Sequence, residues 1–184
     1  AAEQIVDRAE PVDIEHADGE RRGVFLALFD ELVGLQLHPA QIDDEIDHTL
    51  QQIGEFAGAD RSYVFQFSDD QKSVSCTHEW CADQIEPTIE RIQDAPLDAF
   101  QWAMTRFFNG NMVTIPRVSD LPAEADSLKA ELVHQKIQSV LSVPMIVGGK
   151  VIGFIGLDSV REEKMWVEDT SSLLKIIGHV FANA

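Results

Sequence analysis

The sequence predicts an α+β fold built around an antiparallel sheet. Two apolar segments, Ser139–Val147 and Lys150–Asp158, flank Gly148-Gly149, which suits the tight turn of a β-hairpin. A second pair of strands is predicted earlier in the chain. Apolar residues at helical spacing occur before, between and after the two pairs. Such segregation of strands and helices is typical of α+β domains and differs from the strict alternation of a parallel sheet.

Two helices are predicted before the first strand. Arg21–Leu37 carries a wide apolar stripe at helical spacing, more than a lone surface helix tolerates, so this helix packs either on the domain or on a second subunit. His38-Pro39 breaks the pattern. A second helix is then predicted over Ala40–Ala57, and Gly58 is a suitable residue to end it.

The first strand pair is predicted at Arg61–Phe67 and Ser73–Trp80, where apolar and polar residues alternate with a period of two. Turn-forming residues lie between them, so the two strands are expected to form a hairpin. The alternation in the second strand places four side chains on one face: Val74, Cys76, His78 and Trp80.

The middle of the chain is predicted to be mostly helical, with Pro and Gly residues marking the breaks. The expected helices are Ile85–Gln93, Leu97–Phe108 and Ala123–Gln135, with a short strand at Met112–Ile115. A closing helix is predicted over Trp166–Phe181.

Composition excludes several functional classes. The 184 residues carry a net charge of −18, which argues against nucleic acids and anionic membranes as partners. The first 60 residues hold 15 acidic and three basic side chains, so this part is expected to form a separate segment. No apolar run reaches the length of a membrane span. We expect a cytoplasmic, reduced protein, and a piece excised from a longer chain.

The two cysteines offer the main chemical alternatives. Cys76, His78 and Cys81 are ligand types for zinc or iron, but their spacing matches no standard site and a fourth ligand is not evident. The cysteines also suggest a thiol-based reductase, although the nearby Glu79 and Asp83 would raise the pKa of a thiol. Ordinary packing of buried cysteines is favoured over both readings, so no metal site is predicted.

The chain resembles the GAF family over about residues 40–183. The resemblance rests on Gln138–Met145, on Gly148-Gly149-Lys150 with Val151–Asp158, on Ala59–Phe65, and on the closing helix. The segment from Thr77 to Cys81 is similar to GAF domains that accompany other bacterial signalling modules, namely PAS, GGDEF, EAL or histidine-kinase domains.

The resemblance implies a PAS-like sheet of five to six strands, with the terminal helices on one face and ligand-pocket helices and loops on the other. It also implies that residues 1–37 form a linker and signalling helix and that residues 38–184 form the GAF domain. The implied function is sensory and not enzymatic: a small molecule binds, the domain dimerises through its terminal helices, and an attached output module responds. The alternatives are a purely structural dimerisation module, and less favoured, a cysteine-dependent methionine sulfoxide reductase or a metal-binding domain.

The pocket candidates lie in the middle of the chain and on the strand after it. Aromatic side chains there can stack on a planar ligand, and Arg117 either holds an anionic group or pairs with Asp120 to fix its loop. The full set is Trp80, Phe100, Trp102, Phe107, Arg117, Asp120, Leu128 and Ser142.

The ligand stays unknown at this stage. The Asn-Lys…Phe…Asp-Glu signature of cyclic-nucleotide GAF domains is missing. The Cys-His pair of bilin-binding relatives falls near Ser127-Leu128, where neither residue can attach a bilin. Both ligands are therefore disfavoured from the sequence.

Overall fold

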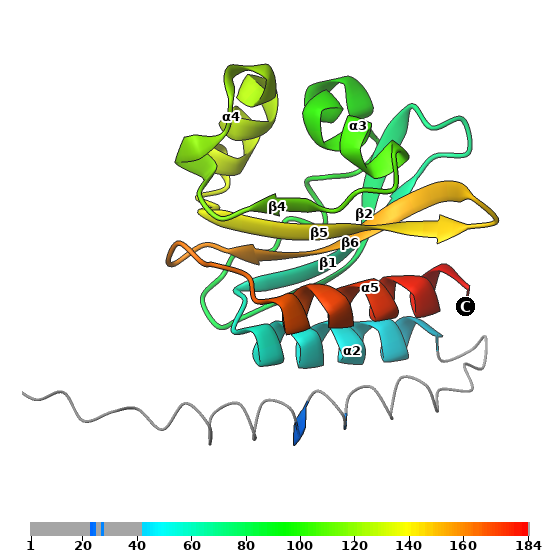
Figure 1. The fold of residues 1–184 in the computed structure, drawn as a ribbon, viewed down its shortest axis with the longest axis vertical. Helices are drawn as coiled ribbons and strands as arrows, with labels where there is room; N and C mark the ends of the chain where they lie inside the picture. Colours follow the sequence, from blue (N-terminus) through cyan, green and yellow to red (C-terminus); the bar gives the residue numbers. More distant parts are fainter. Residues whose placement is uncertain (1–22, 25–26, 28–41, 184) are drawn as a thin grey trace, which may run out of the picture.

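The computed structural model describes residues 23, 24, 27 and 42–183. Residues 42–183 form a six-stranded antiparallel sheet with the strand order β3-β2-β1-β6-β5-β4, covered by helices on both faces (Figure 1). The strands are β1 (Arg61–Phe67), β2 (Ser73–Cys81), β3 (Ala95–Pro96), β4 (Val113–Ile115), β5 (Ser139–Val147) and β6 (Lys150–Ser159).

The helices divide into two layers. On one face of the sheet lie α2 (Ile42–Ala57) and α5 (Glu168–Ala182), and on the other lie α3 (Gln101–Phe108) and α4 (Asp126–His134) (Figure 1). Short 3₁₀ turns complete the second layer: η1 (Leu97–Phe100), η2 (Val118–Asp120) and η3 (Ala123–Ala125). No helix among the described residues combines the length and apolarity that crossing a bilayer requires.

Two hydrophobic cores form because successive side chains of a strand point to opposite faces. On β6, Ile155 and Leu157 are fully buried in the core beneath α2 and α5. Phe154, on the opposite face of the same strand, packs into the second core, beneath α3 and α4. The sheet is therefore the wall that both cores share.

A β-bulge at Thr77 reverses the faces of the sheet to which the side chains of β2 point. Phe65 pairs with Cys76 and Val64 pairs with His78, so Thr77 is an extra residue in β2. Cys76 consequently packs in the core beneath α3 and α4, whereas Trp80 packs in the core beneath α2 and α5. The prediction that Val74, Cys76, His78 and Trp80 share one face is therefore wrong, because regular alternation stops at the bulge.

The predicted α+β class and the sheet with terminal helices on one face are confirmed. Both predicted hairpins are present, and Gly148 and Gly149 adopt positive φ angles of 55° and 82° at the turn of the second. The helix predicted over Arg21–Leu37 falls on residues of which the structure describes only three. The boundary predicted between residues 37 and 38 also lies outside the described residues and stays a prediction.

The helix predicted over Ile85–Gln93 does not form. The carboxylate of Glu79 accepts hydrogen bonds from the backbone N–H groups of Thr88 and Ile89, at 2.7 and 2.9 Å, and from the Thr88 hydroxyl at 2.7 Å. These bonds hold the segment in a single turn against β2. The turn ends where the chain returns to β2, because Ile92 O accepts a hydrogen bond from Cys76 N–H at 2.9 Å and Asp94 adopts a positive φ of 52°.

The two terminal helices approach the sheet at glycines. A Cβ atom on Gly54 of α2 would overlap the six-membered ring of Trp80, and one on Gly178 of α5 would lie 3.0 Å from Ile155 Cγ2. The absence of a Cβ at Gly54 lets the indole of Trp80 pack against the backbone of α2.

We predict that Gly54→Ala lowers the free energy of unfolding by about 1–3 kcal/mol, because overpacking against Trp80 outweighs the better helix propensity of alanine. Urea denaturation measures this change. In a Trp80→Leu background the same substitution should cost less or become stabilising. Equal costs in both backgrounds would show that the contact with Trp80 does not determine the preference for glycine.

Candidate ligand-binding site

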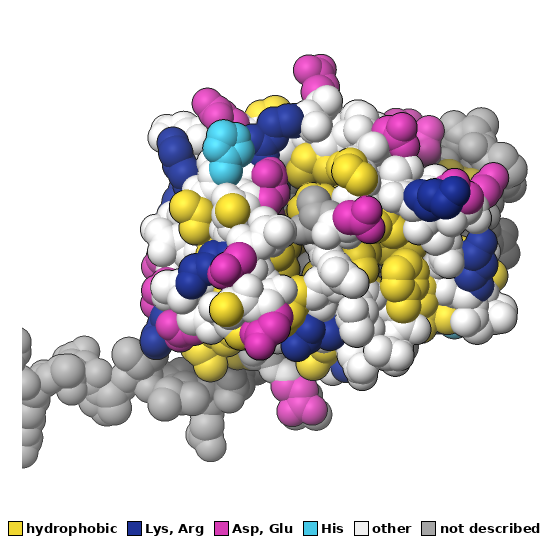
Figure 2. Space-filling model, turned by 90° about the horizontal axis from the view of Figure 1, so that it is seen from above, with side chains coloured by type: hydrophobic (Ala, Val, Ile, Leu, Met, Phe, Trp, Pro, Cys, Tyr) yellow, Lys and Arg dark blue, Asp and Glu magenta, His cyan; other side chains and the backbone are white. Residues whose placement is uncertain are grey.

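A cavity of about 90 Å³ lies between the sheet and the layer formed by α3 and α4. Seen from the side of these helices, hydrophobic side chains gather in the hollow between them (Figure 2). The strands β1, β5 and β6 provide the floor of the cavity, and the helices and the segment before β3 provide its walls.

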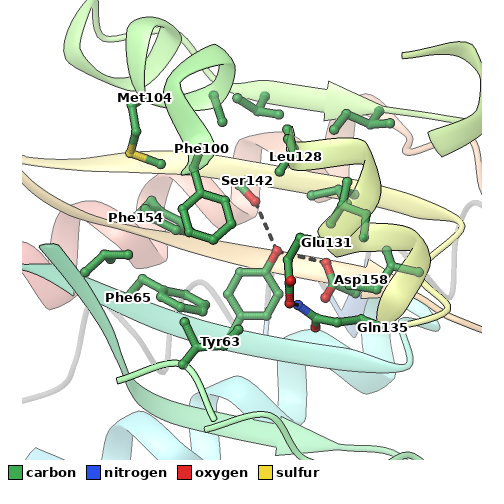
Figure 3. A pocket seen from close by; sticks show the side chains of 18 of the residues that line it. Tyr63, Phe65, Phe100, Met104, Leu128, Glu131, Gln135, Ser142, Phe154 and Asp158 are labelled. Atoms are coloured by element: carbon green, nitrogen blue, oxygen red, sulfur yellow. Dashed lines mark hydrogen bonds between the residues drawn. The ribbon is translucent and has the colours of Figure 1, made fainter. Parts of the chain in front are cut away.

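Aromatic side chains form much of the cavity wall. Phe154 stacks on Phe65 and on Phe107, with ring centroids 4.9 and 4.7 Å apart, and Phe65 meets Tyr63 edge to face at 5.3 Å. Phe100 lies above this group (Figure 3). Fixed rings of this kind suit a ligand with an apolar or planar body.

The floor of the cavity has a polar end. The Tyr63 hydroxyl donates a hydrogen bond to Asp158 Oδ1 at 2.9 Å and lies 3.2 Å from Ser142 Oγ (Figure 3). Gly156 makes this arrangement possible, because a Cβ there would overlap the Tyr63 ring. All three polar side chains are buried, so a ligand that reaches them loses little binding free energy to competing water.

Arg61 lies beside this polar end and joins it to three other segments. Its guanidinium group is 3.5 Å from Asp158 Oδ2 and 3.7 Å from Glu79 Oε1, and it donates a hydrogen bond to Gln135 Oε1 at 3.0 Å. The side chain is only 4% exposed. Its Nε atom has no hydrogen-bond partner within the described part of the chain.

Burial raises the pKa of Asp158 to about 7, and the neighbouring carboxylates of Glu79 and Asp60 add to the increase, although Arg61 and the Tyr63 hydroxyl oppose it. Burial and the nearby Asp158 also hold the pKa of Tyr63 well above its usual range. Asp158 is thus a carboxyl group that can gain or lose a proton near neutral pH.

Glu131 and Gln135, at the C-terminal end of α4, lie beside the same polar end (Figure 3). Gln135 Nε2 donates to Glu131 Oε1 at 2.8 Å, and Glu131 pairs with Arg91 at 3.2 Å. Arg91 belongs to the segment between β2 and β3. This contact therefore connects the two sides of the cavity wall.

The structure brings together four of the eight residues singled out from the sequence. Phe100, Phe107, Leu128 and Ser142 all line the cavity. Their roles in ligand binding stay predictions.

The other four candidates lie elsewhere. Trp80 is on the opposite face of the sheet because of the bulge at Thr77. Trp102 packs at the edge of the second core with the Arg106 guanidinium 3.4 Å from its ring centroid. On the surface, Arg117 pairs with Glu163 at 2.8 Å and with Asp120 at 3.5 Å, which is the loop-fixing arrangement considered above.

Sequence reasoning missed the polar residues of the site. Tyr63 and Asp158 were assigned only to strands, and Arg61, Glu131 and Gln135 were not singled out. A signal existed for the first two: each is a polar or titratable side chain inside an apolar strand, on the face that the alternation assigns to the interior. The partners in α4 have no comparable signal, because they lie on a helix of ordinary composition.

The cysteines lie near these charged groups, since Cys81 pairs with Arg61 across β1 and β2, but neither cysteine lines the cavity. Burial raises the pKa of the Cys76 thiol, and burial together with Glu79 raises the pKa of Cys81 to about 11. The bulge places Cys76 and His78 on opposite faces of β2. Among the described residues, no group of three or more His, Cys, Asp and Glu side chains is arranged to hold a metal ion.

Comparisons with known proteins agree with this fold. A family model described as GAF domain matches residues 41–184. The methanogenesis regulatory histidine kinase FilI of Methanothrix harundinacea is 32% identical over 139 residues, covering 73% of this chain. The match spans only 15% of the length of that kinase.

Solved structures of low sequence identity share the fold. GAF3 of Slr1393 from Synechocystis sp. PCC6803 is similar at a TM-score of 0.66 and 20% identity, covering 77% of this chain and 90% of that one. JSC1_58120g3 with bound biliverdin IXa is similar at a TM-score of 0.70 and 14% identity, covering 87% of this chain and 96% of that one. A phycocyanobilin-bound GAF domain from a cyanobacterial phytochrome is similar at a TM-score of 0.69 and 16% identity, covering 89% of this chain and 92% of that one.

These structures overturn one expectation from the sequence. From the sequence, the missing Cys-His pair near Ser127-Leu128 disfavours a bilin, yet the solved structures that share this fold include GAF domains with bound bilins. The missing pair therefore does not count against a bilin.

The raised pKa of Asp158 predicts a pH dependence of stability. Between about pH 4, where an exposed Asp ionises, and about pH 7, the folded protein keeps a proton that the unfolded chain has lost. Stability relative to an Asp158→Asn variant should therefore fall as pH rises through this range, by at most about 1.4 kcal/mol per pH unit, and level off above it.

Urea denaturation of both proteins at several pH values measures this difference. Asp69→Asn, in the exposed turn after β1, is the matched control and should track the wild type at every pH. A difference between the wild type and Asp158→Asn that does not change with pH would contradict the prediction.

Proposed function

Because this chain belongs to the GAF domain family, we propose that it is a sensory domain that binds a small molecule in the cavity beneath α3 and α4. The observation that carries the proposal is the cavity itself: aromatic walls, closed at one end by Tyr63, Ser142 and Asp158. Phe100, Phe107 and Leu128 are proposed to contact the body of the ligand, and Ser142 its polar group.

The sheet offers a direct route from this cavity to the terminal helices. On β6, Phe154 and Asp158 line the cavity, while Ile155 and Leu157 between them are buried in the core beneath α2 and α5. A ligand that displaces Phe154 therefore acts on one of the two strands that pack against α5, the other being β5. Binding shifts the helix arrangement only if the ligand has different affinities for the two arrangements.

The kinase relative suggests what the domain controls. This chain is similar to one part of FilI, a regulatory histidine kinase. We propose that the domain regulates an output module in a longer parent chain, and that it forms a homodimer through its terminal helices.

We predict that Ala103→Leu abolishes ligand binding while the protein stays folded. Ala103 is buried in α3 and lines the cavity, so a larger side chain occupies the ligand's space. Ala130→Leu is the matched control, since Ala130 is exposed on α4 and lines no described cavity. Native mass spectrometry with an absorption spectrum of the same sample detects a co-purified ligand, and added biliverdin tests the bilin class.

Two outcomes would contradict the proposed function. If neither co-purified nor added compounds bind the wild type, the domain acts without a ligand, as a structural dimerisation module. If Ala103→Leu and Ala130→Leu bind equally well, the ligand occupies some other site.

We also predict a dimer at micromolar concentration. Multi-angle light scattering measures the mass of the full chain and of a chain that begins at residue 38. Loss of the dimer in the shorter chain would assign the contact to residues 1–37, and its retention would assign it to α2 and α5. A monomer in both cases would refute dimerisation by this chain.

A further inference from the structure

We infer that the cavity selects a small organic cation, a protonated amine on a compact apolar body, with Asp158 as its counter-ion. The inference rests on the proposed function and adds the chemical class of the ligand. The observations that carry it are the charges and the aromatic rings around the cavity.

The charged residues that line the cavity are acidic. Asp158 lies at its polar end and Glu131 on its α4 wall, whereas none of the described side chains lining it is Lys, Arg or His. Both carboxyl groups have an arginine nearby, Arg61 at 3.5 Å and Arg91 at 3.2 Å, and neither arginine lines the cavity. A ligand inside the cavity therefore meets carboxyl oxygens and no cation.

The buried charges beneath the cavity are one positive charge short. Arg61 lies between two buried carboxyl groups, those of Asp158 and Glu79, whose side chains are 5% and 1% exposed. With both carboxyl groups ionised, the set carries a net charge of −1. Unpaired charge at such depth is costly, and a ligand cation would balance it.

Asp158 is the carboxyl group with spare accepting capacity. Glu79 accepts three hydrogen bonds from Thr88 and Ile89. Asp158 accepts one, from the Tyr63 hydroxyl, and has Arg61 only at ion-pair distance. A carboxylate can accept about four hydrogen bonds. An ammonium group in the cavity would supply the missing donors.

The aromatic walls suit the same ligand. Tyr63, Phe65, Phe100, Phe107 and Phe154 line the cavity, and aromatic faces attract cations, most strongly where water is excluded. The volume of about 90 Å³ limits the body to a few carbon atoms unless the walls move. An engineered cavity of about 150 Å³ holds benzene.

The test uses three probes of nearly equal shape: isobutylamine, isobutanol and isobutyrate, which are cationic, neutral and anionic at pH 7.5. Each is titrated into the full chain, and ¹H–¹⁵N NMR shifts of cavity residues report binding. We expect the amine to bind at least about tenfold more tightly than the alcohol, a difference of about 1.4 kcal/mol, and isobutyrate most weakly.

The amine should also show a distinctive pH dependence. Its affinity should rise from pH 5.5 to about 7, by up to about tenfold per unit, because binding requires Asp158 to lose its proton. The amine itself stays protonated throughout this range, as a lysine does. The affinity of isobutanol should not rise in the same way.

Asp158→Asn should reduce the preference for the amine over the alcohol to about twofold or less, with isobutanol binding retained as evidence of an intact cavity. Asp69→Asn should keep the full preference. If Asp158→Asn does not fold, the three probes and the pH series on the wild type still decide the question.

The experiment distinguishes a failure of the cation inference from a failure of the proposed sensor function. Equal or tighter binding of isobutanol or isobutyrate would overturn the choice of a cation and leave the proposed sensor function intact. Binding of biliverdin alone would do the same and assign a bilin. If none of these compounds shifts the resonances of cavity residues, the proposed function falls as well.

Discussion

A single buried guanidinium group connects the parts of this domain. Arg61, at the start of β1, reaches Asp158 on β6, Glu79 on β2 and Gln135 after α4. Glu79 in turn holds the segment before β3 in place through Thr88 and Ile89. The strands that form the floor of the cavity and the segments that form its walls are thus positioned by one connected set of charges and hydrogen bonds.

This arrangement lowers stability at the site where binding is proposed. Burying two carboxylates and one guanidinium group in a domain costs more than packing apolar side chains of similar size. The raised pKa of Asp158 has the same cause, since burial disfavours the ionised form. Functional sites commonly combine such local instability with a well-packed scaffold, here the core beneath α2 and α5.

Much of the fold could be predicted from the sequence because its strongest patterns are local. The apolar hairpin around Gly148-Gly149 and the helices α2 and α5 follow from spacing alone. The failures came from contacts distant in sequence. The pairing of Ile92 with Cys76 on β2 ends the predicted helix after one turn, and no local periodicity contains that information.

The site was harder to predict than the fold for the same reason. Phe100, Phe107, Leu128 and Ser142 were among the candidates because the resemblance placed the pocket on segments that line the cavity. Trp80 was misplaced because one extra residue in β2 reverses the direction of the side chains that follow it. Asp158 becomes a candidate site residue only when its burial and its neighbouring residues are known, and neither can be derived from composition.

The close contacts at Gly54 and Gly178 limit how the terminal helices can move. Each glycine lies nearer the C-terminal end of its helix, and the two helices run antiparallel in Figure 1. Buried side chains also hold α2 along its length, at Ile46, Leu50 and Ile53. A slide of α2 along its axis would replace Gly54 over the Trp80 ring by a residue with a Cβ atom, so the glycine fixes the axial position of the helix on the sheet.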